Sequence, residues 1–317
     1  MTSTVKNATG IHVLSQPHLT GIGPLSYGDI RAYLDRAAHY AHELEKGDFV
    51  SDALRGRIVL SLFFENSTRT LVSFEMAARR LGAEVVNWNV EASSLKKGES
   101  FDDTIKTLNA MGPDAIVIRH SEYGAPDYVA RLVDCPVINA GDSWREHPTQ
   151  ALLDALTIEQ ARGGIEGLKV AICGDIAHSR VAHSNMILLR KLGAEVHAVA
   201  PPTLMPEKFP VEGVQVFGTL EEGIADCDIV MMLRLQKERM QEGMIGSDIE
   251  YFRKFGLTHE KLGLASPDAL VMHPGPMNRG VEISDEVADD PERSQILKQV
   301  RNGVPVRMAV LEMLLRE

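Results

Sequence analysis

Several short segments combine hydroxyl, cationic and imidazole side chains of the kinds that bind and polarise small anions. The first is residues 65–70 (ENSTRT), which follow an apolar run and open a predicted helix. Backbone N–H groups at a helix N-terminus attract anions, and Arg69 could add a bidentate contact to a phosphate. The alternative is an ordinary helix cap with a surface arginine. The segment is not a P-loop, because the GxxxxGK[ST] pattern is absent.

Two further segments could bind the same kind of ligand. Residues 93–100 (SSLKKGES) place lysines beside serines and a glycine, which suits a phosphate-binding loop but also a solvated one. His147 and Gln150 belong to HPTQ, which opens a long predicted helix, and they lie about one turn apart on the same side. His147 could donate a hydrogen bond to a carbonyl or phosphate, or it could be a structural histidine.

The second half of the chain contains three more such segments. Residues 174–180 (GDIAHSR) have one glycine, too few for the G-x-G-x-x-G dinucleotide fingerprint, so Arg180 is better interpreted as an anion clamp. Residues 234–239 (RLQKER) are basic and follow a strand, although they could also be the first turn of a solvated helix. Residues 273–276 (HPGP) predict a rigid turn that could contain a cis peptide bond.

Predicted strands and helices alternate along the chain, and these elements determine where the polar segments lie. The spacing predicts strands at 57–64, 84–88, 115–118, 136–140, 168–173, 195–200, 228–233 and 269–272. It predicts helices from Ser26 and at 67–81, 101–111, 149–161, 179–192, 220–224 and 294–315, the last with a break at Gly303–Pro305, and a mobile or draped arm at 1–25. We therefore expect an α/β protein with two doubly wound parallel-sheet domains, helices on both faces, joined by interdomain helices. In such sheets ligands bind beyond the carboxyl ends of the strands, where the polar segments lie.

Composition narrows the function class. The 317 residues carry 33 Lys and Arg against 44 Asp and Glu, a net charge of −11, which argues against a general nucleic-acid or membrane-surface binder. The three cysteines are far apart, so a disulfide framework or a Cys-rich zinc site is not expected. No apolar run approaches the roughly 18–20 residues of a membrane span, and no secretory signal is apparent. A cytoplasmic location is the expectation.

Taken together, the motifs resemble the aspartate/ornithine carbamoyltransferase family. FFENSTRT, KKGES, HPTQ, GDIAHSR, LRLQKER and HPGPMNRG occur in family order, and the resemblance runs from about residue 15 to residue 315. STRT and HPxQ mark the family as a whole. The ornithine enzymes typically carry Cys in the HPxQ box and an HCLP turn, whereas this chain has Thr149, HPGP and the aspartate-type RLQKER. Leu71 departs from the basic residue that most members carry after STRT, next to the phosphate loop but outside the expected ligands.

The resemblance implies a reaction and a domain plan. The carbamoyl group would pass from carbamoyl phosphate to the amine of L-aspartate, giving N-carbamoyl-L-aspartate and phosphate, an early step of de novo pyrimidine biosynthesis, with no cofactor and no metal. Residues 1–151 would bind carbamoyl phosphate, with the C-terminal helix 299–317 packing back on them, and residues 152–298 would bind aspartate. The chain would form a homotrimer with shared active sites. Regulatory chains, a dihydroorotase partner and nucleotide control stay open.

The resemblance also assigns roles to individual residues. By this resemblance, the phosphate would be bound by Ser67, Thr68, Arg69 and Thr70. The carbamoyl group would be bound by Arg119, His147 and Gln150. The aspartate carboxylates would be bound by Arg180, Arg234 and Gln236. Ser93 and Lys97 would come from the neighbouring chain, with Ser94 as an alternative to Ser93, and the backbone around Gly275 and Pro276 would line the carbamoyl pocket. Two alternatives are an ornithine-type transferase and a non-catalytic homologue that serves as an assembly partner.

Overall fold

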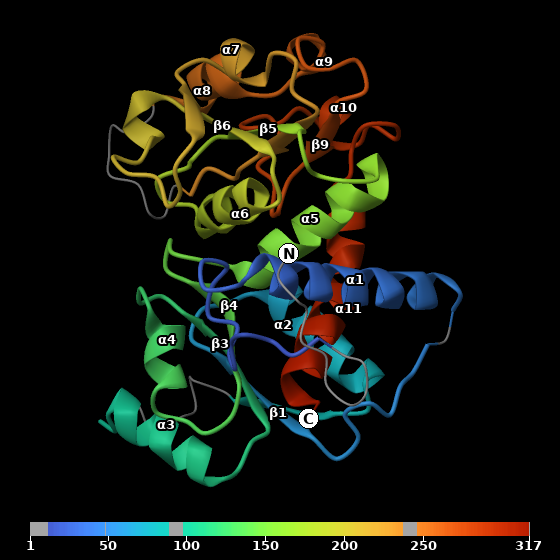
Figure 1. The fold of residues 1–317 in the computed structure, drawn as a ribbon. Coiled ribbons are helices and arrows are strands. Elements are labelled where there is room, and N and C mark those ends of the chain that lie inside the picture. Colours follow the sequence, from blue (N-terminus) through green and yellow to red (C-terminus); the bar gives the residue numbers. More distant parts are fainter. Residues whose placement is uncertain (1–11, 48, 89–97, 237–245, 317) are drawn as a thin grey trace. The chain divides into compact units, whose positions relative to one another are not determined.

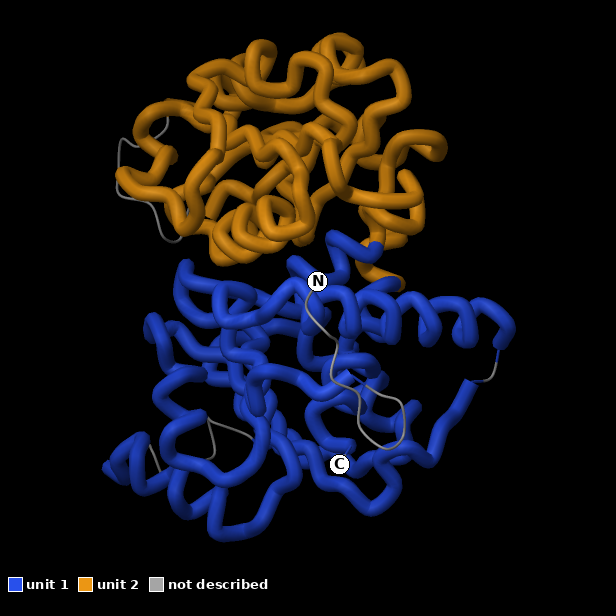
Figure 2. The backbone as a smooth tube through the Cα atoms, in the orientation of Figure 1, with its two compact units in different colours: residues 1–156, 302–317 blue, residues 157–301 orange. Residues whose placement is uncertain are grey.

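The parallel strands of the computed structural model form two separate sheets, one in each of two units (Figures 1 and 2). The structure describes residues 12–47, 49–88, 98–236 and 246–316. Unit 1 contains Met1–Leu156 and Asn302–Glu317, and unit 2 contains Thr157–Arg301. The chain passes from one unit to the other within two helices, α5 (Pro148–Arg162) and α11 (Ile296–Leu315). The expected α/β class with parallel sheets is confirmed.

Unit 1 is built on a four-stranded parallel sheet in the order β2-β1-β3-β4. The strands are β1 (Ile58–Phe63), β2 (Glu84–Trp88), β3 (Ala115–His120) and β4 (Val137–Asp142). Apolar side chains from one face of β1 and β3 pack with α3 (Phe101–Ala110) and α4 (Ala125–Ala130). On the other side of the sheet lie α1 (Tyr27–Glu45), α2 (Thr68–Arg80) and the C-terminal part of α11 (Figure 1). Burial of both sheet faces explains why β1 and β3 consist largely of apolar residues, whereas the edge strand β2 is partly exposed.

Local sequence signals account for the helix ends in unit 1. Ser26 caps α1 in a capping box with Asp29, as a helix predicted from Ser26 requires. Helix α2 ends before Gly82, whose φ of 80° is the left-handed conformation that glycine adopts most easily. The described part of the predicted N-terminal arm packs closely, because Leu19 exchanges backbone hydrogen bonds with β4 and is fully buried.

Unit 2 is built on a five-stranded parallel sheet in the order β7-β6-β5-β8-β9. The strands are β5 (Lys169–Cys173), β6 (Glu195–Val199), β7 (Val214–Phe217), β8 (Ile229–Met232) and β9 (Leu270–Met272). The helical segments between these strands are α6 (Arg180–Lys191), a 3₁₀ turn (Pro202–Leu204), α7 (Leu220–Ile224), α8 (Asp248–Phe255) and α9 (His259–Leu262), and α10 (Asp285–Ala288) follows β9. Sequence analysis missed α4, α8, α9, α10 and the edge strand β7, all of them short.

The predicted break at Gly303–Pro305 is wrong. Helix α11 runs without interruption from Ile296 to Leu315, with Pro305 inside it. Proline removes one backbone hydrogen bond from a helix and normally kinks it. Here Val306 and Met308–Leu311 are almost completely buried, and this packing outweighs the local preference of the sequence.

Candidate active site

The predicted anion-binding segments gather where the strand order of each sheet reverses. In unit 1 the chain moves from β1 outward to β2 and then returns to β3 on the other side of β1. In unit 2 it moves from β5 to β6 and β7 and returns to β8 beside β5. Ligands of doubly wound sheets bind at such switch points, beyond the carboxyl ends of the strands. Residues 65–70 follow β1, Arg119 is the last residue but one of β3, residues 174–180 follow β5, and Arg234 follows β8.

The first turn of α2 lacks the side-chain cap that seven other helices have. Ser67 occupies the N-cap position, but its hydroxyl caps no backbone N–H group. Elsewhere the N-cap hydroxyl accepts from the third helical residue, at Ser26, Ser100, Ser179, Thr219, Ser247, Thr258 and Ser284. The side-chain hydrogen bond of an ordinary helix cap is therefore missing from this segment, whereas Arg69 is a surface arginine as that alternative expects. The N–H groups of α2 and the exposed side chains of Thr68 and Arg69 can face an anion instead.

Arg119 is held beside the α2 segment from two directions. Strand pairing aligns it with Phe63, two residues before Glu65. Its Nε lies 3.3 Å from the Glu65 Oε2, and its guanidinium donates to the Ala140 carbonyl at 3.2 Å. The planar guanidinium carries its N–H donors in a fixed fork, a geometry that matches carboxylate and phosphate oxygens.

The loop that leads to His147 is held by a buried carboxylate at its start. Asp142, fully buried at the end of β4, accepts hydrogen bonds from the Asn139 side chain at 2.8 Å and the Gly124 N–H at 2.9 Å. The Glu146 N–H also donates to it, at 3.2 Å. His147 itself is buried, and its carbonyl accepts the first helical hydrogen bonds of α5, from Gln150 and Ala151. The loop thus brings His147 and Gln150 to the same end of the sheet as Arg119.

In unit 2 a second buried carboxylate joins two of the predicted segments. Asp175 accepts from the His178 ring at 2.7 Å and from the Gln236 N–H at 3.4 Å. The Gln236 side chain donates to the His178 carbonyl at 2.8 Å. Burial raises the pKa of Asp175 above its ordinary value, and the bonds from His178 and Gln236 oppose that shift. Arg180 is buried in the first turn of α6, whereas Arg234 is half-buried.

The HPGP turn has the cis peptide bond that the sequence suggested, between Gly275 and Pro276. His273 Nδ1 accepts from the Gly275 N–H at 2.9 Å, so the ring proton lies on Nε2, which donates to Glu282 at 3.2 Å. Both side chains are fully buried. Asn278 donates to Glu282 through its N–H and to the Leu235 carbonyl through its side chain at 3.5 Å. The turn is thereby connected to the segment that carries Arg234 and Gln236.

Ser93, Ser94 and Lys97 lie outside the described residues, as does the KER part of RLQKER. Their assigned roles stay predictions. The predicted residues of unit 1 (Ser67–Thr70, Arg119, His147 and Gln150) and those of unit 2 (Arg180, Arg234, Gln236, Gly275 and Pro276) each gather at the carboxyl ends of their own sheet.

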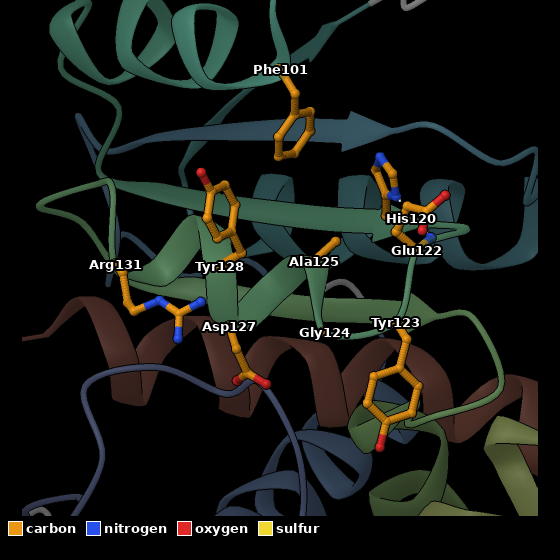
Figure 3. A pocket seen from close by; sticks show the side chains of 9 residues that line it. All are labelled: Phe101, His120, Glu122, Tyr123, Gly124, Ala125, Asp127, Tyr128 and Arg131. Carbon is orange, nitrogen blue, oxygen red and sulfur yellow. Dashed lines mark hydrogen bonds between the residues drawn. The ribbon is translucent and has the colours of Figure 1, made fainter.

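A pocket of about 600 Å³ lies elsewhere on unit 1 (Figure 3). Phe101, His120 and Tyr128 surround it, with Asp127 and Arg131 at its edge. Successive strand residues point to opposite faces, so His120 faces away from the side that Arg119 faces. None of the predicted site residues within the described ranges lines this pocket.

Sequence reasoning missed the buried acidic residues that hold the site together. Asp142, Asp154, Asp175 and Glu282 are all fully buried. The available signal was an acidic residue within or just after each motif, since buried carboxylates need specific partners. Among residues 12–47, 49–88, 98–236 and 246–316, no group of three His, Cys, Asp or Glu side chains is arranged to hold a metal ion. In the same ranges no helix is both long and apolar enough to span a bilayer.

Fold and site together define an α/β protein with cationic and hydroxyl side chains at the carboxyl ends of two parallel sheets, an arrangement suited to small anions. Residues 17–160 match the carbamoyl-P binding domain of aspartate/ornithine carbamoyltransferases, and residues 166–314 match the Asp/Orn binding domain. The chain belongs to this aspartate/ornithine carbamoyltransferase family.

Individual relatives point to the aspartate branch. The chain is 59% identical to the aspartate carbamoyltransferase catalytic subunit of Rhodospirillum rubrum, covering 94% of this chain and 93% of that one. The chain is also 56% identical to the corresponding subunit of Ruegeria pomeroyi, and the match covers 94% of this chain and 96% of that one. Aspartate transcarbamoylase from Trypanosoma cruzi in complex with carbamoyl aspartate and phosphate has a similar structure, with a TM-score of 0.86, 33% identity and 99% coverage of both chains. The ornithine carbamoyltransferase of Pyrococcus furiosus shares the fold, with a TM-score of 0.84, 30% identity and coverage of 93% and 95%.

Proposed function

We propose that the chain transfers the carbamoyl group from carbamoyl phosphate to the amine of L-aspartate, forming N-carbamoyl-L-aspartate and phosphate. The observation that carries this proposal is the uncapped first turn of α2 beside the fixed guanidinium of Arg119. The relatives at 54–59% identity, all aspartate carbamoyltransferase catalytic subunits, support the choice of substrates. By family, the reaction belongs to pyrimidine biosynthesis.

Unit 1 binds carbamoyl phosphate in this proposal. Ser67, Thr68, Arg69 and Thr70 hold the phosphate with hydroxyl, guanidinium and backbone N–H donors. Arg119 and His147 donate to the carbonyl oxygen, and Gln150 addresses the carbamoyl nitrogen. Lys97, with Ser93, adds a cation from a neighbouring chain of a homotrimer.

Unit 2 binds aspartate. Arg180 and Arg234 pair with the two carboxylates, because a guanidinium matches a carboxylate in charge and planar geometry. Gln236 assists, and its orientation is supported by its bonds to Asp175 and to the His178 carbonyl. The backbone at Gly275 and Pro276 lines the carbamoyl pocket.

The chemistry needs electrostatic stabilisation more than a nucleophilic side chain. The neutral amine of aspartate attacks the carbamoyl carbon, a C–N bond forms, and negative charge gathers on the carbonyl oxygen. Thr70, Arg119 and His147 stabilise that oxygen as an oxyanion hole does. The C–O bond to phosphate then breaks, Arg69 and Lys97 offset the charge of the leaving group, and phosphate accepts the amine proton.

A colorimetric assay for carbamoyl aspartate with the purified chain tests the proposal. Product should form with carbamoyl phosphate and aspartate, and none should form when ornithine replaces aspartate. Carbamoylation of ornithine in place of aspartate would support the ornithine-type alternative. Absence of product with either acceptor, in a folded sample, would support the non-catalytic homologue.

A further inference from the structure

Gln150 is hydrogen-bonded to a buried aspartate one turn further along α5. Its side-chain Nε2 donates to Asp154 Oδ1 at 2.9 Å. Asp154 is fully buried, whereas Gln150 is half-buried. A carboxylate can only accept hydrogen bonds, so the NH₂ group of the amide must face Asp154. The carboxylate of Asp154 therefore fixes the orientation of the Gln150 amide.

Arg307 supplies the positive charge that opposes Asp154. This arginine of α11 is only 4% exposed, and it lies 5.0 Å from the centre of the Phe74 ring. Burial lowers the pKa of Arg307 to about 10, and the charge of Asp154 counteracts that lowering. At neutral pH the guanidinium is therefore charged and favours the ionised carboxylate.

The backbone of α11 is shaped to admit this arginine. Arg307 donates to the Gly303 carbonyl at 3.1 Å. A Cβ atom at Gly303 would lie 2.6 Å from the Arg307 Nη1, closer than real contacts allow. Gly303 thus leaves the space that the guanidinium occupies.

We propose that Asp154 is a positioning residue, which turns the carbonyl oxygen of Gln150 toward the substrate and so selects a substrate that donates a hydrogen bond. The inference rests on the proposed function, in which Gln150 addresses the carbamoyl group. The NH₂ group of carbamoyl phosphate can donate to that oxygen. Acetyl phosphate carries a methyl group at the same place and cannot. Asp154 therefore sets the discrimination between carbamoyl and acetyl phosphates without touching either.

The test compares carbamoyl phosphate as substrate with acetyl phosphate as competitive inhibitor. Asp154→Asn keeps the volume of the side chain, but the new amide can both donate a hydrogen bond to Gln150 and accept one from it. The Gln150 amide can therefore rotate. The ratio of the acetyl phosphate Ki to the carbamoyl phosphate KM should fall roughly 3- to 10-fold, the value of one neutral hydrogen bond. A merely structural role would weaken both ligands alike and leave the ratio unchanged, which would overturn the proposal.

A double-mutant cycle shows whether Asp154 acts through Gln150. Gln150→Ala should lower the same ratio, and adding Asp154→Asn should lower it no further. An additional fall in the double variant would also overturn the proposal. Asp35→Asn removes an exposed carboxylate from α1 and serves as the matched control, with no change expected.

Asp154→Asn leaves the buried charge of Arg307 without its opposing charge, which can prevent folding. Asp154→Asn/Arg307→Met removes both charges, and the ratio should fall in this variant as well. Failure of the wild-type chain to make carbamoyl aspartate would contradict the proposed function. An active wild-type chain whose ratio is insensitive to Asp154 would contradict only the role of Asp154.

Discussion

At the scale of single residues, Arg69 and Arg234 lie in different units and should serve different substrates. We predict that Arg234→Ala raises the KM for aspartate much more than it weakens binding of carbamoyl phosphate. Loss of one partner of a buried charge pair costs about 2–5 kcal/mol, which is roughly 30- to 4,000-fold in affinity. Arg69→Ala should instead weaken mainly the binding of carbamoyl phosphate, because the proposed role of Arg69 is to hold the phosphate. Steady-state kinetics with each substrate varied, and calorimetric binding of carbamoyl phosphate alone, measure the two effects.

Arg55→Ala is the control for general charge effects, since Arg55 is an exposed arginine of the same unit as Arg69. It should leave both constants unchanged. Equal weakening of both substrates by Arg234→Ala would refute the division between the units.

Asp29 makes a residue-scale prediction about pH. It is fully buried and accepts hydrogen bonds from His12 at 2.8 Å and from Ser26. Burial alone would raise the pKa of this carboxyl, but the bonds from Ser15, His12 and Ser26 outweigh it and hold the pKa well below its usual value. The ionised carboxylate therefore stabilises the fold above the unfolded pKa of about 3.9, and this stabilisation is lost progressively as the pH falls below that value.

We expect Asp29→Asn to lower the free energy of unfolding by about 2–3 kcal/mol at pH 7. The difference from the wild-type chain should shrink as the pH is lowered from 5 toward 3, because the Asp29 carboxyl is then protonated in the unfolded chain while it stays ionised in the folded chain, which favours unfolding of the wild-type chain. Urea denaturation across this pH range measures it, with Asp35→Asn as an exposed control. If the difference in the free energy of unfolding stays constant with pH, the charge of the Asp29 carboxylate does not stabilise the fold.

At the scale of elements, the passage from β5 to α6 depends on a glycine. Gly174 has a φ of 125°, and a Cβ atom there would lie 2.9 Å from the Leu233 carbonyl oxygen. This crowding arises because β5 and β8 are neighbours, and the Leu233 N–H donates to the Cys173 carbonyl. The close approach brings Asp175 within reach of Gln236.

Gly174→Ala should therefore destabilise the chain by roughly 1–3 kcal/mol. It should also raise the KM for aspartate, because both segments that are proposed to bind aspartate must shift. Thermal unfolding and kinetics test this. Gly112→Ala is the matched control, since Gly112 also has a positive φ of 73° but nothing lies within 4 Å of its Cβ position. If both variants lose stability equally and retain the wild-type KM, the contact with Leu233 does not position the site.

At the scale of the whole molecule, the shared active site of the proposed trimer can be tested by mixing inactive variants. Lys97→Ala and His147→Ala should each be nearly inactive. Contacts in a cyclic trimer are heterologous, so each chain lends its 93–99 segment to one neighbour only. A mixed trimer then has one interface where an intact His147 meets an intact Lys97, so about a third of its sites should recover.

The measurement is activity after the two variants are dissociated and reassociated together. Each variant treated alone is the control and should stay inactive. If mass spectrometry shows hybrid trimers in the mixture and the mixture is still inactive, Lys97 acts within its own chain or does not act.

The sequence by itself determined the class of fold and most of the segments that carry the candidate site. Strand β2 and helix α7 have the predicted bounds, and the other predicted strands and helices are recovered with small shifts at their ends. Apolar runs and helical spacing are local properties that a short window of sequence contains. Because parallel strands end at one edge of a sheet, the polar residues that follow them could be assigned to a common site before any contact was known.

Only the tertiary structure decided what holds those residues in place. Asp175 reaches Gln236 across 61 positions of the chain, and Arg36 on α1 pairs with Glu312 on α11 across 276. Such partners are fixed by which strands and helices become neighbours, and local spacing does not encode this. The same holds for α11, where burial carries the helix through Pro305, and for Ser67, whose hydroxyl does not form the cap that its local sequence allows. Local sequence preferences are worth about 1–3 kcal/mol, so tertiary packing overrides them where the surrounding contacts contribute more free energy.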